Sequence, residues 1–257
     1  MIKAINIFKK FGDQEVLKGI TADFEPGKAN LIIGQSGAGK TVLLKILVGL
    51  IPPTSGEIWY NDINFTQLDK KGSRAIRMEV GMLFQGSALF DSMSIGNNVR
   101  FPLDMFTNMT TKEKNDRVNY CLERVDLEGV NKKFPSEVSG GMQKRVGIAR
   151  AIVLNPKYLF CDEPNSGLDP KTSILIDELI HTITKENNIT TIINTHDMNS
   201  VMEIGDTICF IHDGMLEWHG TKSEVLTSTN EELQQFIFAS PFLQRLRDSA
   251  LGNKQTV

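Results

Sequence analysis

The sequence predicts an α/β protein with a mostly parallel sheet. The glycine-rich pattern G-x-x-x-x-G-K-T stands at residues 34–41, between the short β-branched run Asn30–Ile33 and the apolar stretch Val42–Leu50. Two more short apolar runs, Tyr158–Asp162 and Thr190–Asn194, are separated by a segment long enough for a helix. Strand, helix and strand in this order are typical of right-handed crossovers in a doubly wound sheet.

The loop at residues 34–41 has the residue types that phosphate binding requires. Glycines let the backbone approach an anion closely, Lys40 offers a charge to the β and γ phosphates, and the Thr41 hydroxyl can ligate magnesium. The residues expected to contact the nucleotide here are Gly34, Gln35, Ser36, Gly37, Ala38, Gly39, Lys40, Thr41 and Val42. The sequence therefore predicts a P-loop nucleoside triphosphatase core, with an ordinary glycine turn as the alternative.

Composition limits the remaining function classes. The chain has 257 residues, 40% of them hydrophobic, and a formal net charge of −3, so a large core is possible and no nucleic-acid partner is expected. Its three cysteines are far apart, which argues against a disulfide framework or a zinc site. No signal-peptide pattern is present, and the apolar stretch Val42–Ile51 is short and contains Lys45. We expect a chain that does not span a membrane.

The elements before and after the loop follow from periodicity. Residues 2–8 and 16–24 alternate as two strands, and 56–60 suggest a third, so an antiparallel β subdomain is expected beside the core. A helix is expected from near Pro170, and residues 207–211 and 215–218 are expected to form a terminal hairpin around Asp213 and Gly214.

Between these parts the pattern turns helical. Thr110 and Glu113 have the spacing of a capping box, and an apolar stripe follows at i, i+3, i+4 and i+7. Another helix is expected from Ser139 to before Pro156. We expect a helical subdomain at about 86–153 inserted into a domain of residues 1–230, with a C-terminal extension at 231–257.

Two carboxylates close the strand at Tyr158–Asp162. Asp162 is suited to hold magnesium, and Glu163 follows at once as a group that can polarise the water attacking the γ-phosphate. A plain pair of loop carboxylates is the alternative.

Ser139, Gly140 and Gly141 stand about twenty residues before this pair. Ser139 can cap the following helix, and the two glycines leave its N-terminus bare for a second anion. The segment Val138–Arg145 resembles the signature sequence of ABC-type ATPases. The resemblance implies a head-to-tail dimer of two copies, in which Lys40 of one and Ser139 of the other close on the same ATP.

Other positions match the motifs of the same family in order. Gln85 is similar to the Q-loop glutamine, which implies a role in catalysis and at magnesium, and His196 to the switch histidine. Asp169 ends the segment similar to the D-loop, and Phe11 stands where the family has an aromatic residue that stacks on adenine. Met142 departs from the glutamine that usually ends the signature, which puts one side-chain contact in doubt.

The resemblance implies the ATPase subunit of a membrane transporter, bound to transmembrane permease subunits. A soluble ABC-type ATPase, such as one for iron-sulfur cluster assembly, and the ATPase of a non-lipid transporter are the alternatives; a kinase would not need the Ser139–Gly141 segment. Residues 84–94, with Ala88, Leu89 and Phe90 after the Q-loop, look like the ATPases of the Mla and Mce class of bacterial lipid transporters. That narrower resemblance implies lipid transport, a Mce-domain lipid-binding protein as partner, and peripheral attachment to the cytoplasmic face of the inner membrane.

Overall fold

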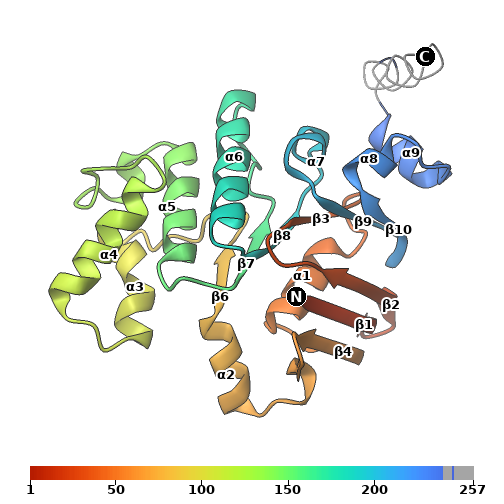
Figure 1. Cartoon of the computed structure of the whole chain (residues 1–257), viewed down its shortest axis with the longest axis horizontal. Helices are drawn as coiled ribbons and strands as arrows, with labels where there is room; N and C mark the ends of the chain where they lie inside the picture. Colours follow the sequence, from red (N-terminus) through yellow and green to blue (C-terminus); the bar gives the residue numbers. More distant parts are fainter. Residues whose placement is uncertain (240–244, 246–257) are drawn as a thin grey trace.

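The computed structural model describes residues 1–239 and residue 245, and the chain folds into two β-sheets with helices around them (Figure 1). The six-stranded sheet has the order β10 (Met215–Thr221), β9 (Thr207–His212), β3 (Ala29–Ile33), β8 (Thr190–Asn194), β7 (Tyr158–Asp162) and β6 (Val80–Leu83). Its strands pair in parallel except β10, which is antiparallel to β9. The predicted α/β fold with a mostly parallel sheet is confirmed.

The antiparallel layer forms a second sheet. Its order is β2 (Gln14–Phe24), β1 (Ile2–Phe11), β4 (Ser55–Tyr60) and β5 (Ile63–Asn64). Strands β1 and β2 are longer than their alternation predicted, and Phe11 pairs with Gln14 across a tight turn. The aromatic side chain at position 11 is therefore carried at the very end of the hairpin.

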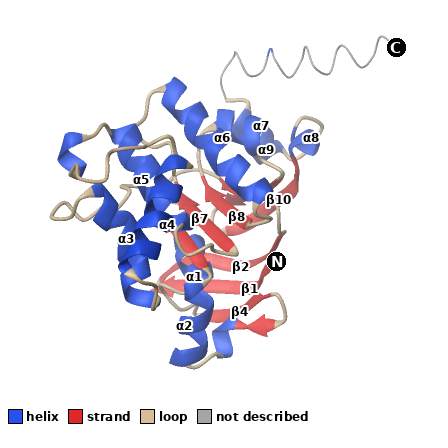
Figure 2. Ribbon diagram, turned by 60° about the vertical axis from the view of Figure 1, so that its left-hand side comes forward, coloured by secondary structure: helices blue, strands red, loops and turns tan. Residues whose placement is uncertain are grey.

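Successive residues of the parallel strands point into two different cores. Ile32 and Ile192 pack with α1 (Lys40–Val48) and the antiparallel sheet, whereas Leu31 and Ile193 pack with the helices on the opposite face. These include α6 (Pro170–Glu186) and α7 (Met198–Ile204), which cover the side of the sheet away from β1, β2 and β4 (Figure 2). Burial on both faces explains why these strands are continuous apolar runs.

Three helices between β6 and β7 stand together at one side of the molecule (Figure 1). They are α3 (Ile95–Phe106), α4 (Thr111–Glu123) and α5 (Gly140–Ile152). The capping box before α4 is present, since the Thr110 backbone N–H donates to Glu113 Oε2 at 2.7 Å and the Glu113 N–H donates to Thr110 Oγ1 at 3.3 Å. The predicted apolar stripe is buried: Val118, Cys121 and Leu122 lie in α4, and Val125 lies two residues after its end.

Helix α2 (Lys70–Met78) and strand β6, which precede this group, are among the elements that were not predicted from the sequence. Helix α2 is mostly polar, and β6 has only four residues, one of them Gly81. A Cβ at Gly81 would lie 2.3 Å from the Ala151 carbonyl oxygen, so the strand needs glycine to pack against the end of α5. This close approach removes the β-branched signal that marks the neighbouring strands.

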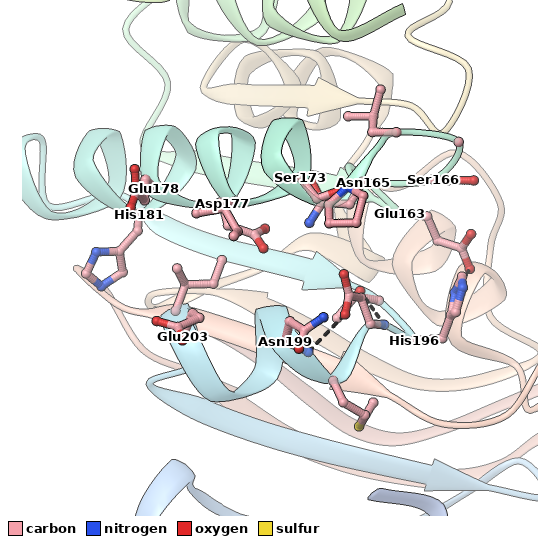
Figure 3. Close-up of a pocket in the computed structure, with 18 of the residues that line it drawn as sticks. Glu163, Asn165, Ser166, Ser173, Asp177, Glu178, His181, His196, Asn199 and Glu203 are labelled. Carbon is pink, nitrogen blue, oxygen red and sulfur yellow. Dashed lines mark hydrogen bonds and ion pairs between the residues drawn. The ribbon is translucent and has the colours of Figure 1, made fainter. Parts of the chain in front are cut away.

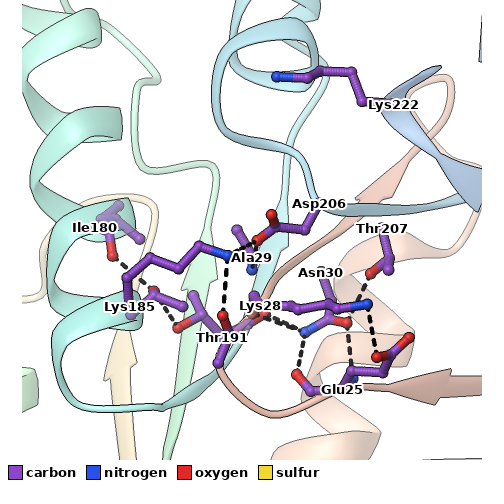
Figure 4. Close-up of polar contacts among 12 residues, drawn as sticks. Glu25, Lys28, Ala29, Asn30, Ile180, Lys185, Thr191, Asp206, Thr207 and Lys222 are labelled. Atoms are coloured by element: carbon purple, nitrogen blue, oxygen red, sulfur yellow. Dashed lines mark hydrogen bonds and ion pairs between the residues drawn. The ribbon is translucent and has the colours of Figure 1, made fainter.

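A buried polar cluster ties together the starts of three parallel strands (Figure 4). The Asn30 amide donates to the carbonyls of Glu25, Lys28 and Thr191 at 3.0 Å, and its oxygen accepts from Thr207 Oγ1 at 2.8 Å and the Glu25 N–H at 2.9 Å. Because all these groups are paired, burial of the amide is tolerated. The cluster fixes β3, β8 and β9 in register at the end opposite the phosphate loop.

The remaining helices are short. They are the 3₁₀ turns η1 (Phe65–Gln67) and η2 (Pro135–Glu137), and α8 (Lys222–Val225) and α9 (Glu231–Ile237). In α9, Leu233 and Ile237 are buried in the core of their own domain, and the Phe236 ring stacks on Phe210 at 5.3 Å. The apolar residues Phe242, Leu243 and Leu246 of the expected C-terminal extension lie outside the described residues.

Candidate nucleotide site

The predicted site residues gather where the parallel strands end. The phosphate loop follows β3, Asp162 is the last residue of β7, and Asn194 is the last of β8. Gln85 stands two residues after β6, and His196 two residues after β8. Ligands bind at this edge in open α/β sheets, because the loops that leave neighbouring strands converge there.

The loop 34–41 needs glycine for steric reasons at two positions. Gly34 has φ +147°, and a Cβ there would lie 2.1 Å from the Ile211 carbonyl oxygen. Gly39 has φ +101°, and its Cβ would lie 2.7 Å from Leu17 Cδ2. Both are conformations or approaches that an L side chain does not allow. Strands β9 and β2 thus pack so closely against the loop that these two positions require glycine.

Lys40 is held inside this loop. Its Nζ donates to the carbonyl oxygens of Gly34 at 2.8 Å and Gln35 at 2.9 Å, and the residue is 6% exposed. Burial lowers the pKa of Lys40, while Glu163 and Asp162 act in the opposite direction. Gly39 precedes α1 without any side-chain cap, so the first N–H groups of this helix have no side chain to satisfy them. The arrangement leaves cationic and N–H donors for an anion.

An oxygen-rich cluster lies beside the loop. Thr41 Oγ1 donates to Asp162 Oδ1 at 3.3 Å, and Asn194 Nδ2 donates to the same Thr41 and Asp162 oxygens at 3.0 and 2.5 Å. Asn194 Oδ1 is buried and has no hydrogen-bond partner in the described part of the chain. Carboxylate, hydroxyl and amide oxygens are the donors that Mg²⁺ prefers. The residues present therefore fit a magnesium ion.

Glu163 is the next residue after Asp162, and both of its carboxylate oxygens have hydrogen-bond partners. His196 Nδ1 lies 3.1 Å from Oε1, and Gln85 Nε2 donates to Oε2 at 3.0 Å and more loosely to Ser166 Oγ at 3.4 Å. Glu163 has a positive φ of 47°, and its N–H donates to the Asn194 carbonyl at 2.8 Å. The left-handed backbone turns the carboxylate out of the line of β7. Gln85 thus points at Glu163 and not at the Thr41 and Asp162 pair.

The segment 139–141 and Asp169 lie together in a different place. Ser139 caps α5 by accepting from the Met142 N–H at 3.3 Å, and Asp169 caps α6 by accepting from the Thr172 N–H at 3.1 Å. The Thr172 hydrogen bonds also lower the pKa of Asp169. Both caps line a recess of about 280 Å³ that includes none of residues 34–41. Within one described chain, Ser139 and Lys40 are not joined by any hydrogen bond.

Phe11 lies half exposed at the end of β1, with Lys9 Nζ 5.0 Å from its ring centroid. Three residues beyond its partner Gln14, Leu17 contacts the loop at Gly39. The half-exposed ring is thus carried by the hairpin that packs on the phosphate loop.

Two residues at the site were not among the candidates. Asn194 joins Thr41 to Asp162, and Lys144, 5% exposed on α5, donates from Nζ to the Gln85 carbonyl and, at 3.4 Å, to that of Glu163. Burial lowers the pKa of Lys144. Asn194 and Asp162 each end a short apolar strand. This pattern is visible in the sequence, and it could have predicted that the two side chains lie at the same edge of the sheet. Lys144 has no such signal, because its partners lie far away in the sequence.

Together the strand order, the glycine-shaped loop, the buried lysine and the oxygen cluster define a phosphate-loop nucleoside triphosphatase. A sequence profile of the family described as "ABC transporter" matches residues 17–166. The chain belongs to this family, and it is the ATP-binding subunit of an ABC transporter and an ATPase that binds ATP with Mg²⁺.

Curated relatives extend the match along nearly the whole chain. A probable ribonucleotide transport ATP-binding protein mkl of Mycobacterium leprae is 37% identical over 92% of this chain and 68% of its own length. The chloroplastic protein trigalactosyldiacylglycerol 3 of Arabidopsis thaliana is 34% identical over 93% and 74%. A methionine import ATP-binding protein MetN of Carboxydothermus hydrogenoformans is 35% identical over 94% and 72%.

Solved structures agree. A dimeric ATP-binding cassette in a post-hydrolysis state, bound to ADP and Pi, superimposes with a TM-score of 0.79 and 32% identity, over 86% of this chain and 99% of its own. Among the described residues, every helix is too short or too polar to cross a membrane.

Proposed function

We propose that two copies of this chain close around two ATP molecules and energise phospholipid transport between membranes. The copies would bind transmembrane permease subunits at the cytoplasmic face of a bacterial inner membrane, with a Mce-domain lipid-binding protein as a further partner. The convergence of Gln85 and His196 on Glu163, beside the phosphate loop, is the observation that supports the catalytic part.

In this proposal Glu163 is the residue that polarises the attacking water. Its two oxygens are held by different partners, so the carboxylate has one orientation, and a carboxylate fixed in this way suits general-base work. His196 orients it from one side. Gln85 holds it from the other, and connects it to the loop that leaves β6 toward the helical group.

Lys40 and the loop residues 34–42 would bind the phosphates, and Thr41, Asp162 and Gln85 would hold magnesium directly or through water. When bound, the ion neutralises charge on the phosphate oxygens. In the structure the Gln85 amide is turned toward Glu163, so of these three only Thr41 and Asp162 already lie together. The half-exposed Phe11 ring would stack on the adenine.

In the proposed dimer, the recess around Ser139 contacts the ATP that the other copy binds. Ser139, Gly140, Gly141 and Asp169 lie together and apart from the phosphate loop of their own chain. A second copy, placed head to tail, would bring this recess against the ATP held by Lys40 of the first. The dimeric cassette bound to ADP and Pi, similar over 86% of this chain, supports that arrangement.

The lipid assignment is supported by two observations outside the catalytic centre. Residues 84–94 resemble the Mla and Mce class, and one relative carries the name of a galactolipid. The relatives named for ribonucleotide transport and methionine import favour an ABC transporter with another substrate as the second candidate.

A surface next to Gln85 suits the permease. Asn98 is fully buried on α3 and pairs with the backbone N–H and C=O of Phe90 at 2.8 and 3.0 Å, while Arg150 donates to the Ser87 and Ala88 carbonyls. The loop is therefore rigid, and it presents Phe90 41% exposed against Phe101. A fixed apolar side chain suits a helix laid into a groove. We propose that residues 86–105 receive a cytoplasmic helix of the permease.

The experiment is purification of the tagged protein from gently solubilised membranes of its native cell, followed by mass spectrometry of proteins and lipids. We expect a polytopic permease, a Mce-domain protein and phospholipid. The variant Phe90→Asp should lose the permease while keeping the ATP binding of the isolated subunit, and Phe134→Asp, at another exposed phenylalanine, serves as the matched control.

Three other results would each reject one part of the proposed function. A permease without a Mce-domain protein or lipid would reject the lipid assignment and leave the transporter ATPase. Soluble partners alone, such as iron-sulfur assembly proteins, would reject the proposed transport role. Full permease recovery with Phe90→Asp would reject the docking surface.

A further inference from the structure

A buried carboxylate lies behind the Glu163 and His196 pair, and the proposed catalytic roles do not use it. Asp177 is on α6, is only 4% exposed, and lines a cavity of about 850 Å³ that also includes Glu163 and His196 (Figure 3). Carboxylates are rarely buried to this extent without a charged partner. The hydrogen-bonding partners of Asp177 are instead neutral groups.

Asp177 begins a chain of two hydrogen bonds that joins three segments. Ser200 Oγ, on α7, donates to Asp177 Oδ2 at 2.7 Å, and Asn165 Nδ2 donates to the same Ser200 Oγ at 3.0 Å. Asn165 is two residues after Glu163, and Ser200 is four residues after His196. The chain thus links the loop that carries Glu163 to the helix that follows His196, with α6 as the anchor.

All three members are buried: Asp177 is 4% exposed, Asn165 is 8% and Ser200 is 0%. A hydrogen-bonded chain of buried groups has few alternative geometries, since its members have few other partners within reach. The Ser200 hydroxyl connects the two bonds, because it accepts from Asn165 and donates to Asp177. Removing Ser200 or Asn165 breaks the bond between the loop and α7, and removing Asp177 leaves that bond without its anchor on α6.

Stability does not explain why the anchor is a carboxylate. Among the described residues, Asp177 Oδ1 and Asn165 Oδ1 are buried and have no hydrogen-bond partner, which carries an energetic cost. Burial raises the pKa of Asp177 to about 6; the hydrogen bonds with Ser200 and Asn165 oppose this rise, and Asp197 and Glu203 act in the same direction as burial. The folded state therefore binds the proton more tightly than the unfolded state does, and this group lowers the stability as the pH rises through 6.

Within the part of the chain that the structure describes, no lysine or arginine lines the cavity to offset this cost. The ionisable groups that line the cavity with Asp177 are Glu178 and His181 on α6, Asp197 and Glu203 at α7, and Glu163 and His196 at the site itself. A hydrophobic residue of similar size at position 177 would avoid the electrostatic cost.

We infer that Asp177 is a positioning residue for ATP hydrolysis, which holds Glu163 and His196 at their 3.1 Å separation through Ser200 and Asn165. The inference rests on the proposed role of Glu163. None of the three residues reaches the phosphate loop in the described structure, so the chain acts on the geometry of the water-activating pair and not on nucleotide binding.

The test compares Asp177→Leu with the conservative Asp177→Asn. Asparagine keeps an oxygen that accepts from Ser200, whereas leucine removes the acceptor and keeps the branching of the side chain. We expect Asp177→Leu to lower kcat roughly 10-fold, the scale of a misplaced catalytic group, and to leave KM for ATP unchanged. Asp177→Asn should restore most of kcat. An equal fall in both variants, or a change confined to KM, would overturn the inference.

A second measurement separates positioning from general stability. Introduced beside Glu163→Gln, Asp177→Leu should cause no further loss of kcat, because the residue it positions is already disabled. A further 10-fold loss would overturn the inference. Ser200→Ala removes the central hydroxyl without adding volume, so it gives the same comparison if Asp177→Leu does not fold. Thermal melts of each variant verify that the protein assayed is folded.

Failure of the inference and failure of the proposed function give different results. If Glu163→Gln alone keeps normal turnover, the role of Glu163 is rejected, and the positioning role with it. If Glu163→Gln reduces turnover but folded Asp177→Leu and Ser200→Ala both keep the kcat of the unaltered protein, only the positioning role is rejected.

Discussion

Glu163→Gln is expected to lower the ATP turnover number by roughly 10²- to 10⁴-fold, the contribution of a positioned general base. The amide is nearly isosteric and still accepts from Gln85 Nε2, so the site keeps its shape. It has no basic oxygen for a water proton. Phosphate release under saturating Mg·ATP measures the effect, and equilibrium binding of a labelled nucleotide verifies that affinity persists.

The matched control for this change is Glu178→Gln. Glu178 is an exposed glutamate on α6 that lines the same cavity but makes no hydrogen bond with Gln85 or His196. It should retain normal turnover. Turnover at the normal rate in Glu163→Gln would show that another group activates the water.

Lys40→Ala is expected to weaken ATP binding by roughly 10- to 100-fold, because a buried charge-assisted contact is worth about 1.5 to 3 kcal/mol. Lys40 is preorganised for this contact, since two loop carbonyls hold its ammonium group beside the bare N-terminus of α1. Isothermal titration with Mg·ATP measures the change.

Lys45→Ala is the control for the previous change, because Lys45 is exposed on the same helix and leaves the loop untouched. Its affinity should equal that of the unaltered protein. Thermal melting without nucleotide shows whether Lys40→Ala also loosens the loop. Unchanged affinity in a folded Lys40→Ala protein would contradict the assignment of the loop to the phosphates.

The core of the fold could be predicted because its strands are short and buried on both faces. Such strands read as continuous apolar runs, as Leu31–Ile33 and Ile192–Ile193 do, and the phosphate loop fixes where the first of them ends. Helix α4 carries its own local signals, the capping box at Thr110 and a stripe of period 3.6. These features depend on residues close together in the sequence.

The parts that escaped prediction depend on distant partners. β6 contains Gly81 because the end of α5, seventy positions later, passes close to it. Asn194 and Lys144 act on Thr41 and Gln85, which lie far away along the chain. No local pattern encodes such contacts, so the oxygen cluster and the anchoring of Gln85 became visible only with the fold.

Some of the catalytic candidates meet within one chain, and others are expected to meet only across two copies. Glu163, Gln85 and His196 were predicted to act together, and they do lie within hydrogen-bond distance. Ser139 and Lys40 were predicted to act across two copies, and one chain alone holds them in different places. Their joint role stays a prediction for the dimer.

The central claim, that ATP is held between two copies, is tested most directly by the mass of Glu163→Gln in solution. Because this variant is expected to hydrolyse the ATP that it binds only slowly, sedimentation velocity with saturating Mg·ATP should give the mass of two chains. With ADP it should give the mass of one chain. Adding Ser139→Arg should abolish the doubling. If Glu163→Gln sediments as one chain while titration shows ATP bound, the two copies do not share the nucleotide, and the account of Ser139 is wrong.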